Sequence, residues 1–178
     1  MPDNSKLTEV IVRCHQELNE LFLLHQEAVL LGNFDDAILL MDCFRELHHL
    51  HMSFEDESLI PGLDGLGERG RWPASLYRDE HAKVQELMGK TRNSLLSLSE
   101  DRLSNKSLRR RIIGFLDKEK TFKGLLEHHQ EREEVGILPE LDAHTDTRWR
   151  VSVIKPFLKE WNDRMQRNMS IVNGIDFP

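Results

Sequence analysis

The sequence predicts an all-α protein, an antiparallel up-down-up-down four-helix bundle with an extra helix near its C-terminus. Three observations lead to this prediction. Apolar residues recur every three or four positions through four long segments, which is the period of an amphipathic helix. Stretches rich in glycine, asparagine or serine separate these segments. The first separation is only Gly32 and Asn33, so the first two helices should form an antiparallel hairpin.

The first expected helix spans about residues 6–31, and its inward stripe falls at positions 11, 15, 18, 22, 25 and 29. Gly32 suits a helix C-terminus, and Asn33 can cap a second helix that continues to about residue 59. Histidines occupy inward positions in both helices, and a glutamate does so in the second. These polar stripe residues are His15, His25, His48, His51 and Glu55.

A glycine-rich loop over residues 62–72 should precede a third helix over about 73–98, with Pro73 in its first turn. The fourth helix is expected from about residue 105 to 141. In the tail, a helix from about Pro156 to Ile171 should begin with Pro156 in its first turn. We therefore expect a bundle over residues 1–142 and a helical extension over residues 143–178. The extension would pack on the bundle or form the interface of a homodimer.

Composition narrows the class of protein. The chain has 178 residues, of which 39% are hydrophobic and 31% charged, as in a water-soluble helical protein. A net charge of −7 argues against nucleic-acid binding. Two cysteines, Cys14 and Cys43, provide no disulfide framework. The longest apolar run, residues 37–41, cannot cross a membrane, and the N-terminus lacks an export signal. We expect a cytoplasmic protein with no membrane partner.

One motif occurs twice. His51 is followed by Glu55 after four residues and by Pro61 after ten, and His129 is followed in the same way by Glu133 and Pro139. In a helix, residues four apart lie on the same face. Each copy therefore places an imidazole beside a carboxylate, which is a pair of potential metal ligands.

Helix geometry predicts that further histidines join these pairs. Residues equally distant from the turn of an antiparallel hairpin lie at the same height. His15 and His51 are each 18 residues from Asn33, and His81 and His129 are each 24 residues from residue 105. We therefore expect four imidazoles and two carboxylates in one layer of the bundle.

A single His-x-x-x-Glu pair would most simply be a surface ion pair or a hydrogen-bonded core histidine. Here both glutamates lie on inward stripes, where a buried carboxylate without a partner costs several kcal/mol. A cation resolves that cost. Nitrogen and carboxylate ligands without thiolate suit iron, manganese or zinc, and six side chains exceed the needs of one tetrahedral zinc. The predicted metal ligands are His15, His51, Glu55, His81, His129 and Glu133.

With these spacings and the trailing prolines, the chain resembles the hemerythrin-like, or HHE cation-binding, family over about residues 7–142. The resemblance implies a four-helix bundle around a non-haem di-iron centre, usually with an oxygen atom between the two irons. Glu55 and Glu133 would bridge the two irons, and the four histidines would cap them. Zinc or manganese could substitute.

The chain differs from the oxygen-carrying members of that family. Those members have His-x-x-x-His on the third helix. In this chain the residues four before and four after His81 are Tyr77 and Gln85. Glu134 replaces the aspartate expected five residues after His129. The remaining set of four histidines and two glutamates is similar to that of nitrosative-stress repair and iron-sensing proteins. We therefore expect a protein that binds or senses dioxygen, nitric oxide or iron. The alternatives are a di-iron enzyme such as a ferroxidase or peroxidase, and a structural metal-bound or metal-free bundle.

Several other polar residues receive simpler interpretations. His25 should be a hydrogen-bonded core residue rather than part of a second metal position. His48 could support the metal site or act as an alternative ligand. Tyr77 should pack with its hydroxyl satisfied. The residues that fall off the inward stripes should be solvated: His49, Glu80 and His128.

Overall fold

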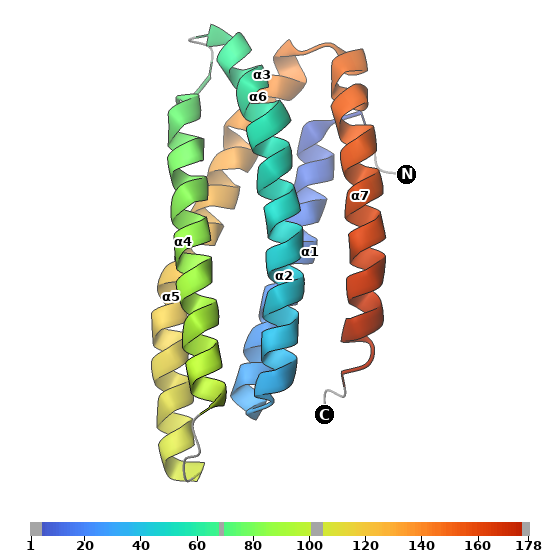
Figure 1. Cartoon of the computed structure of the whole chain (residues 1–178). Helices are drawn as coiled ribbons and strands as arrows, with labels where there is room; N and C mark the ends of the chain where they lie inside the picture. The colour runs from blue at the N-terminus through green and yellow to red at the C-terminus, as the bar shows by residue number, and fades with distance from the viewer. Residues whose placement is uncertain (1–4, 68–69, 101–104, 176–178) are drawn as a thin grey trace.

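The computed structural model describes residues 5–67, 70–100 and 105–175, and this part of the chain contains helices and no strands (Figure 1). The predicted all-α fold is confirmed. The elements in chain order are α1 (Leu7–Leu31), α2 (Phe34–Phe54), the π-helix η1 (Glu55–Leu59), α3 (Ile60–Gly65), α4 (Ala74–Ser99), α5 (Asn105–Val135), α6 (Ile137–His144) and α7 (Thr147–Val172).

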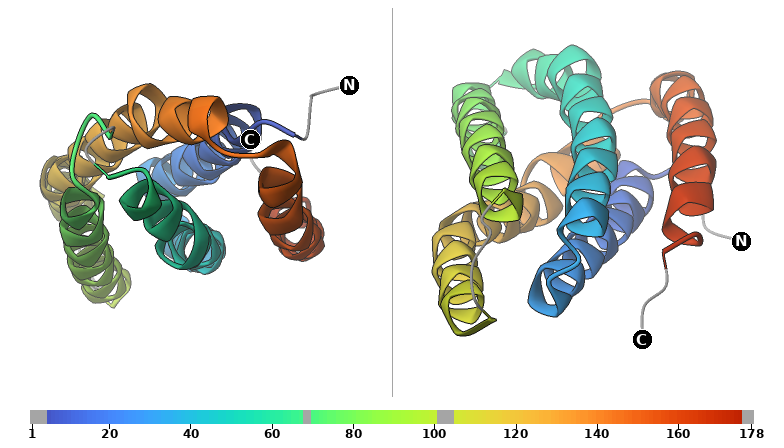
Figure 2. Two further views of the ribbon diagram at one scale, coloured as in Figure 1. Left: turned by 90° about the horizontal axis from the view of Figure 1, so that it is seen from above. Right: turned by 60° about the horizontal axis from the view of Figure 1, so that its bottom comes forward.

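The four long helices of the bundle pack as two neighbouring hairpins, α1 with α2 and α4 with α5. Contacts between α2 and α4 and between α1 and α5 join the hairpins. Helix α7 lies along the outside of α1 and α2, on the side away from α4 and α5 (Figure 2). The core therefore lies between the two hairpins, with a second apolar layer under α7.

The two-residue link between α1 and α2 forms as its sequence predicts. Gly32 has a left-handed backbone with φ of 78°, which glycine adopts without steric cost. The amides of Gly32 and Asn33 donate to the carbonyls of Val29 and Ala28 at 3.0 and 2.9 Å. Asn33 precedes α2, but its side chain makes no capping hydrogen bond.

Two of the expected helix ends are wrong, and both lie within the repeated His-x-x-x-Glu…Pro motif. Helix α2 ends at Phe54 and continues as the π-helix η1, in which the amide of Ile60 donates to the carbonyl of Glu55, five residues back. Helix α5 ends at Val135 instead of about residue 141, and α6 follows after Gly136. Pro61 and Pro139 lie in the first turns of α3 and α6, the part of a helix in which proline is tolerated.

The tail helix begins earlier than expected. Asp146 caps α7 by accepting a hydrogen bond from the backbone amide of Arg148 at 2.6 Å, so the helix starts at Thr147. Pro156 is inside the helix and not in its first turn. The carbonyl four residues earlier belongs to exposed Ser152, so water can satisfy it.

Polar bonds fasten the start of α1 to α6 and α7. The Asp142 carboxylate accepts from the backbone amides of Leu7 and Thr8 at 2.8 and 3.0 Å, and so caps the N-terminus of α1. Arg150 of α7 donates to the carbonyls of Ser5 and Asp142 at 2.9 and 3.1 Å. The Arg150 side chain is buried, so these charge-assisted bonds fix where α7 leaves the bundle.

Aromatic side chains attach the rest of α7. Phe157 stacks on Phe54 of α2 with ring centroids 4.2 Å apart. Trp161 is fully buried, and its indole N–H donates to the Glu17 carboxylate of α1. Burial of these aromatic rings stabilises the packing of α7 on the bundle.

Gly136, between α5 and α6, occupies a position that admits no larger residue. Its backbone has φ of −121° and ψ of −94°. A Cβ atom there would lie 2.6 Å from the Tyr77 hydroxyl, 2.7 Å from the Arg132 carbonyl and 2.7 Å from the Trp72 ring. All three distances are shorter than van der Waals contact, so the sharp break after α5 depends on this glycine.

We predict that Gly136→Ala lowers the free energy of unfolding by about 1–3 kcal/mol, because the overlap forces backbone or ring shifts in a packed region. Gly114→Ala is the matched control, since nothing lies within 4 Å of a Cβ at that helical position. The control should stabilise the protein by about 0.5–1 kcal/mol. Urea unfolding of the metal-free variants measures both, and equal effects would contradict the assigned break.

Candidate metal centre

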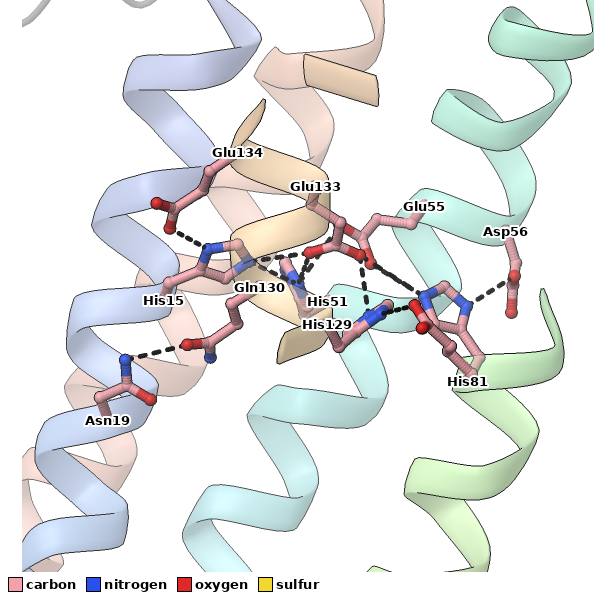
Figure 3. Close-up of polar contacts among 11 residues, drawn as sticks. His15, Asn19, His51, Glu55, Asp56, His81, His129, Gln130, Glu133 and Glu134 are labelled. Carbon is pink, nitrogen blue, oxygen red and sulfur yellow. Dashed lines mark hydrogen bonds and ion pairs between the residues drawn. The ribbon is translucent and has the colours of Figure 1, made fainter. Parts of the chain in front are cut away.

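The six predicted ligand residues come together inside the bundle, near the C-terminal ends of α2 and α5 (Figure 3). Four long helices and the π-helix η1 contribute these residues. All six side chains are buried, with 2% or less of their surface exposed. They are His15 on α1, His51 on α2, Glu55 on η1, His81 on α4, and His129 and Glu133 on α5.

Their nitrogen and oxygen atoms form two overlapping groups. One contains His15 and His51, the other contains His81 and His129, and both contain Glu55 and Glu133. Within each group the potential ligand atoms lie within 4.8 Å of one another. Two metal ions could therefore be held side by side with the carboxylates between them.

Each hairpin places its two histidines at the same height. The ring centroids of His15 and His51 are 4.9 Å apart, and those of His81 and His129 are 4.8 Å apart. The antiparallel hairpin geometry accounts for both pairs, because each histidine of a pair is equally far from its turn.

The Nε2 atoms of the four imidazoles face the shared carboxylates. For Glu133, the oxygens lie 3.1 Å from Nε2 of His15 and 2.8 Å from Nε2 of His129. For Glu55, they lie 3.3 Å from Nε2 of both His51 and His81. Four nitrogens thus surround two carboxylates in a space closed to solvent.

Three of the imidazoles are held from outside by a carboxylate at Nδ1. Glu134 lies 2.8 Å from His15, Asp56 lies 2.8 Å from His81, and Glu80 lies 3.1 Å from His129. A carboxylate accepts a hydrogen bond, so each Nδ1 carries a hydrogen, and a ring that has lost its second proton presents the lone pair of Nε2 inward. Such partners fix the tautomer and orientation of metal-binding histidines.

The expectation that Glu80 is solvated is therefore wrong. Glu80 is half-buried, accepts from His129 and forms an ion pair with Arg132. The cause is tertiary: Glu80 lies on α4 and His129 on α5, so no sequence spacing links them. His49 and His128 are exposed as predicted.

The π-helix η1 supplies a carboxylate on the Nε2 side of the histidines and another on the Nδ1 side of His81. It places Glu55 against His51 and His81, while the next residue, Asp56, reaches Nδ1 of His81. In a regular helix, adjacent residues point about 100° apart. In the widened turn, Glu55 and Asp56 contact the two nitrogens of one imidazole, that of His81. Such turns are frequent at functional sites.

Several inward-facing atoms lack a hydrogen-bond partner among the described residues. They are both oxygens of Glu55, one oxygen of Glu133, Nε2 of His81 and Nε2 of His129. Buried polar atoms without partners are costly and need an explanation. Here all of them are good cation ligands around one small space, so the residues present fit metal ions.

Without a metal, protons take the place of cations in this site. Burial by itself would lower the pKa of His15, but the adjacent carboxylates of Glu133 and Glu134 outweigh it and raise that pKa to about 9. Burial of His81 is likewise outweighed, by the carboxylates of Glu133 and Glu55 near its Nε2, and its pKa rises to about 11. A metal must therefore displace protons from the imidazoles.

Three further buried groups lie outside the six. His25 is a core histidine, as predicted: its Nδ1 donates to the Ala37 carbonyl at 2.9 Å and its Nε2 lies 2.8 Å from Glu119. Glu119 is buried and was not foreseen, because only the fold brings α5 to His25. Burial raises the pKa of Tyr77 to about 12, and its hydroxyl is bonded to the Ile137 backbone.

These features define a helical bundle with a buried histidine and glutamate metal site. The family model for the hemerythrin HHE cation-binding domain matches residues 6–141. The chain belongs to this family, and it is a metal-binding hemerythrin-like protein. No curated protein and no solved structure gives a significant match. Among the described helices, none combines the length and apolar composition that crossing a bilayer requires.

We predict that His129→Ala lowers the metal content of the purified protein by roughly tenfold or more, because a buried ligand is lost. His128→Ala is the matched control, since the neighbouring side chain is exposed. It should leave metal content unchanged. Elemental analysis measures both variants, and equal losses would mean that α5 presents a different face to the site.

We predict opposite pH dependences for the metal-bound and metal-free protein. Metal affinity should rise with pH, because protons leave His15 and His81 only as pH approaches their raised pKa values of about 9 and 11. Metal content at about pH 4.5 should thus be far below that at about pH 7.5. Equal content at both would exclude the histidines as ligands.

The free energy of unfolding of the metal-free protein should behave in the reverse way. The folded-state pKa values of His15 and His81 lie above the ordinary value of 6.5, so their contribution is complete below about pH 6.5 and declines as pH rises through about 9 and 11. Urea unfolding of chelator-treated protein measures this decline.

Proposed function

We propose that this protein holds two iron ions, one between His15 and His51 and the other between His81 and His129. Glu55 and Glu133 would lie between the ions and contact both. The observation that carries this proposal is the pair of groups that share the two carboxylates. Nitrogen and oxygen donors without thiolate are consistent with iron, and also with manganese or zinc as substitutes. Membership of the family supports a metal that is typically iron.

We further propose that the centre binds or senses a small ligand, dioxygen or nitric oxide, or responds to iron supply. When bound, iron would supply Lewis acidity and redox chemistry toward such a ligand. The chain's own residues exclude bulk water, since every inward ligand is buried. Glu134, Asp56 and Glu80 hold protons on Nδ1 of three histidines and so keep their Nε2 atoms available.

The division of the chain remains a proposal: a domain over residues 1–142 and an extension over residues 143–178. It is supported by the match over residues 6–141 and by the position of α7 outside the four long helices. The possible homodimer and the cytoplasmic location remain predictions from the sequence.

Iron loading tests the proposed function. Metal-free protein is incubated anaerobically with ferrous iron, freed of excess metal, and analysed for iron per chain and for visible absorption before and after exposure to dioxygen or nitric oxide. We expect two irons per chain and a spectrum that changes with the ligand. Glu133→Gln should lose at least one iron, because one shared carboxylate is removed.

Glu131→Gln is the control for this experiment, since Glu131 is exposed beside His128. Uptake of no iron by the wild-type protein would contradict the proposal. Sustained turnover of ferrous iron or peroxide would replace it by the enzymatic alternative, a ferroxidase or peroxidase.

A further inference from the structure

A hollow with a basic lining lies between α4 and α5, in the part of this hairpin that carries no metal ligand. This basic hollow has a volume of about 360 Å³. Its charged lining residues are Arg110, Arg111 and Lys118 of α5, and α4 adds the hydroxyls of Ser94 and Ser97. The described residues that line it include no acidic side chain. A chain with a net charge of −7 thus gathers three cations and two hydroxyls around one small space.

Two of these three cations have no structural role in the described fold. Arg110 and Lys118 are exposed, and neither forms an ion pair with another described residue. By contrast, Arg92 of α4 donates to both carboxylate oxygens of Asp42 at 2.6 and 2.8 Å. Arg110 and Lys118 are therefore available to bind an anion from solution.

A second, apolar hollow of about 510 Å³ adjoins the basic one along the same two helices. The two hollows share Ser94, Phe115 and Lys118 as lining residues. Leu87 and Phe122 extend the lining of this apolar hollow beyond Phe115. Binding sites for small molecules are typically hollows of roughly 300–1,000 Å³ with a mostly apolar lining and a few polar groups. Together the hollows form one groove, with an apolar part and a positively charged end.

Glu119 also lines the apolar hollow, but its carboxylate is bonded to the core. The residue is only 1% exposed. One of its oxygens lies 2.8 Å from Nε2 of His25, and the other accepts from the Gln26 amide at 2.8 Å. Both oxygens are therefore bonded to side chains of α1, and the exposed charges of the described groove lining are all positive.

We propose that the groove binds a phosphate monoester with an apolar tail, its phosphate in the basic hollow and its tail in the apolar hollow. A phosphate accepts several hydrogen bonds at once, and arginine and lysine are its usual partners. The tail gains free energy by leaving water for an apolar surface. This site is separate from the metal centre, because Lys118 precedes His129 by eleven residues, or about 16 Å along α5. The proposal therefore does not rest on the di-iron function.

Isothermal titration calorimetry of the purified, metal-containing protein tests this proposal. The probe is decyl phosphate below the concentration at which it forms micelles. We expect saturable binding of decyl phosphate and at least tenfold weaker binding of inorganic phosphate, which lacks the tail. Arg110→Gln and Lys118→Gln should each raise the decyl phosphate Kd about threefold or more, because each removes one charged contact. Leu87→Gln should weaken decyl phosphate binding and leave inorganic phosphate binding unchanged.

Arg109→Gln is the matched control, since it removes the neighbouring exposed charge, which does not line either hollow. It should bind decyl phosphate nearly as the wild type does, and urea unfolding and metal analysis should be the same for every variant. Equal losses in Arg109→Gln and Arg110→Gln overturn the proposal, because they would indicate attraction to local charge alone. Equal affinities of the wild type for inorganic and decyl phosphate also overturn it, as does tighter binding of adenosine monophosphate, which lacks an apolar tail. Absence of decyl phosphate binding overturns it as well and leaves the metal centre unaffected.

Discussion

The structure depends on the burial of two carboxylates, Glu55 and Glu133, in the centre of a helical bundle. A buried carboxylate without compensation would be too costly to keep charged. Here four imidazoles surround the pair, and the pKa of Glu133 is held well below its ordinary value because the charge of His129 and the surrounding hydrogen bonds outweigh burial. Glu133 therefore stays charged, and its charge must be balanced by protons on the imidazoles or by metal ions. The site can therefore exist in a protonated state or in a metal-bound state.

The fold serves this balance by fixing each imidazole from two sides. Nε2 faces the shared carboxylates, and a second carboxylate holds Nδ1 of three of the four rings. Arg132 extends one of these links outward, since it pairs with Glu80 and lies over the ring of Trp72. The same Trp72 ring closes on Gly136, where α5 breaks. The end of the ligand-bearing helix and the orientation of His129 are thus coupled through one set of contacts.

The sequence predicted the helical bundle and the positions of the six inward residues because both follow from local periodicity. Equal distances from two turns are enough to place His15 level with His51, and His81 level with His129. It did not predict Glu80 as a partner of His129, or Glu119 as a partner of His25, because those contacts join different helices at heights that only packing determines. The π-helix was missed for another reason: a single widened turn leaves the 3.6-residue pattern before and after it intact. Helix α7 starts earlier than the sequence predicts, because Asp146 provides the cap and Pro156 lies inside the helix.

The extension changes the environment of one half of the site, which explains why the two halves are unlike. Trp161 of α7 packs beside α2 with its ring centroid 6.4 Å from that of His51. Phe157 of α7 stacks on Phe54 of α2. The rings that α7 places over α2 supply no carboxylate to Nδ1 of His51, which has no hydrogen-bond partner among the described residues. The family match ends at residue 141, before α7 begins, so the cover comes from outside the matched region. The shared bundle can therefore supply the paired ligands, while the added helix makes the half of the site around His51 less polar.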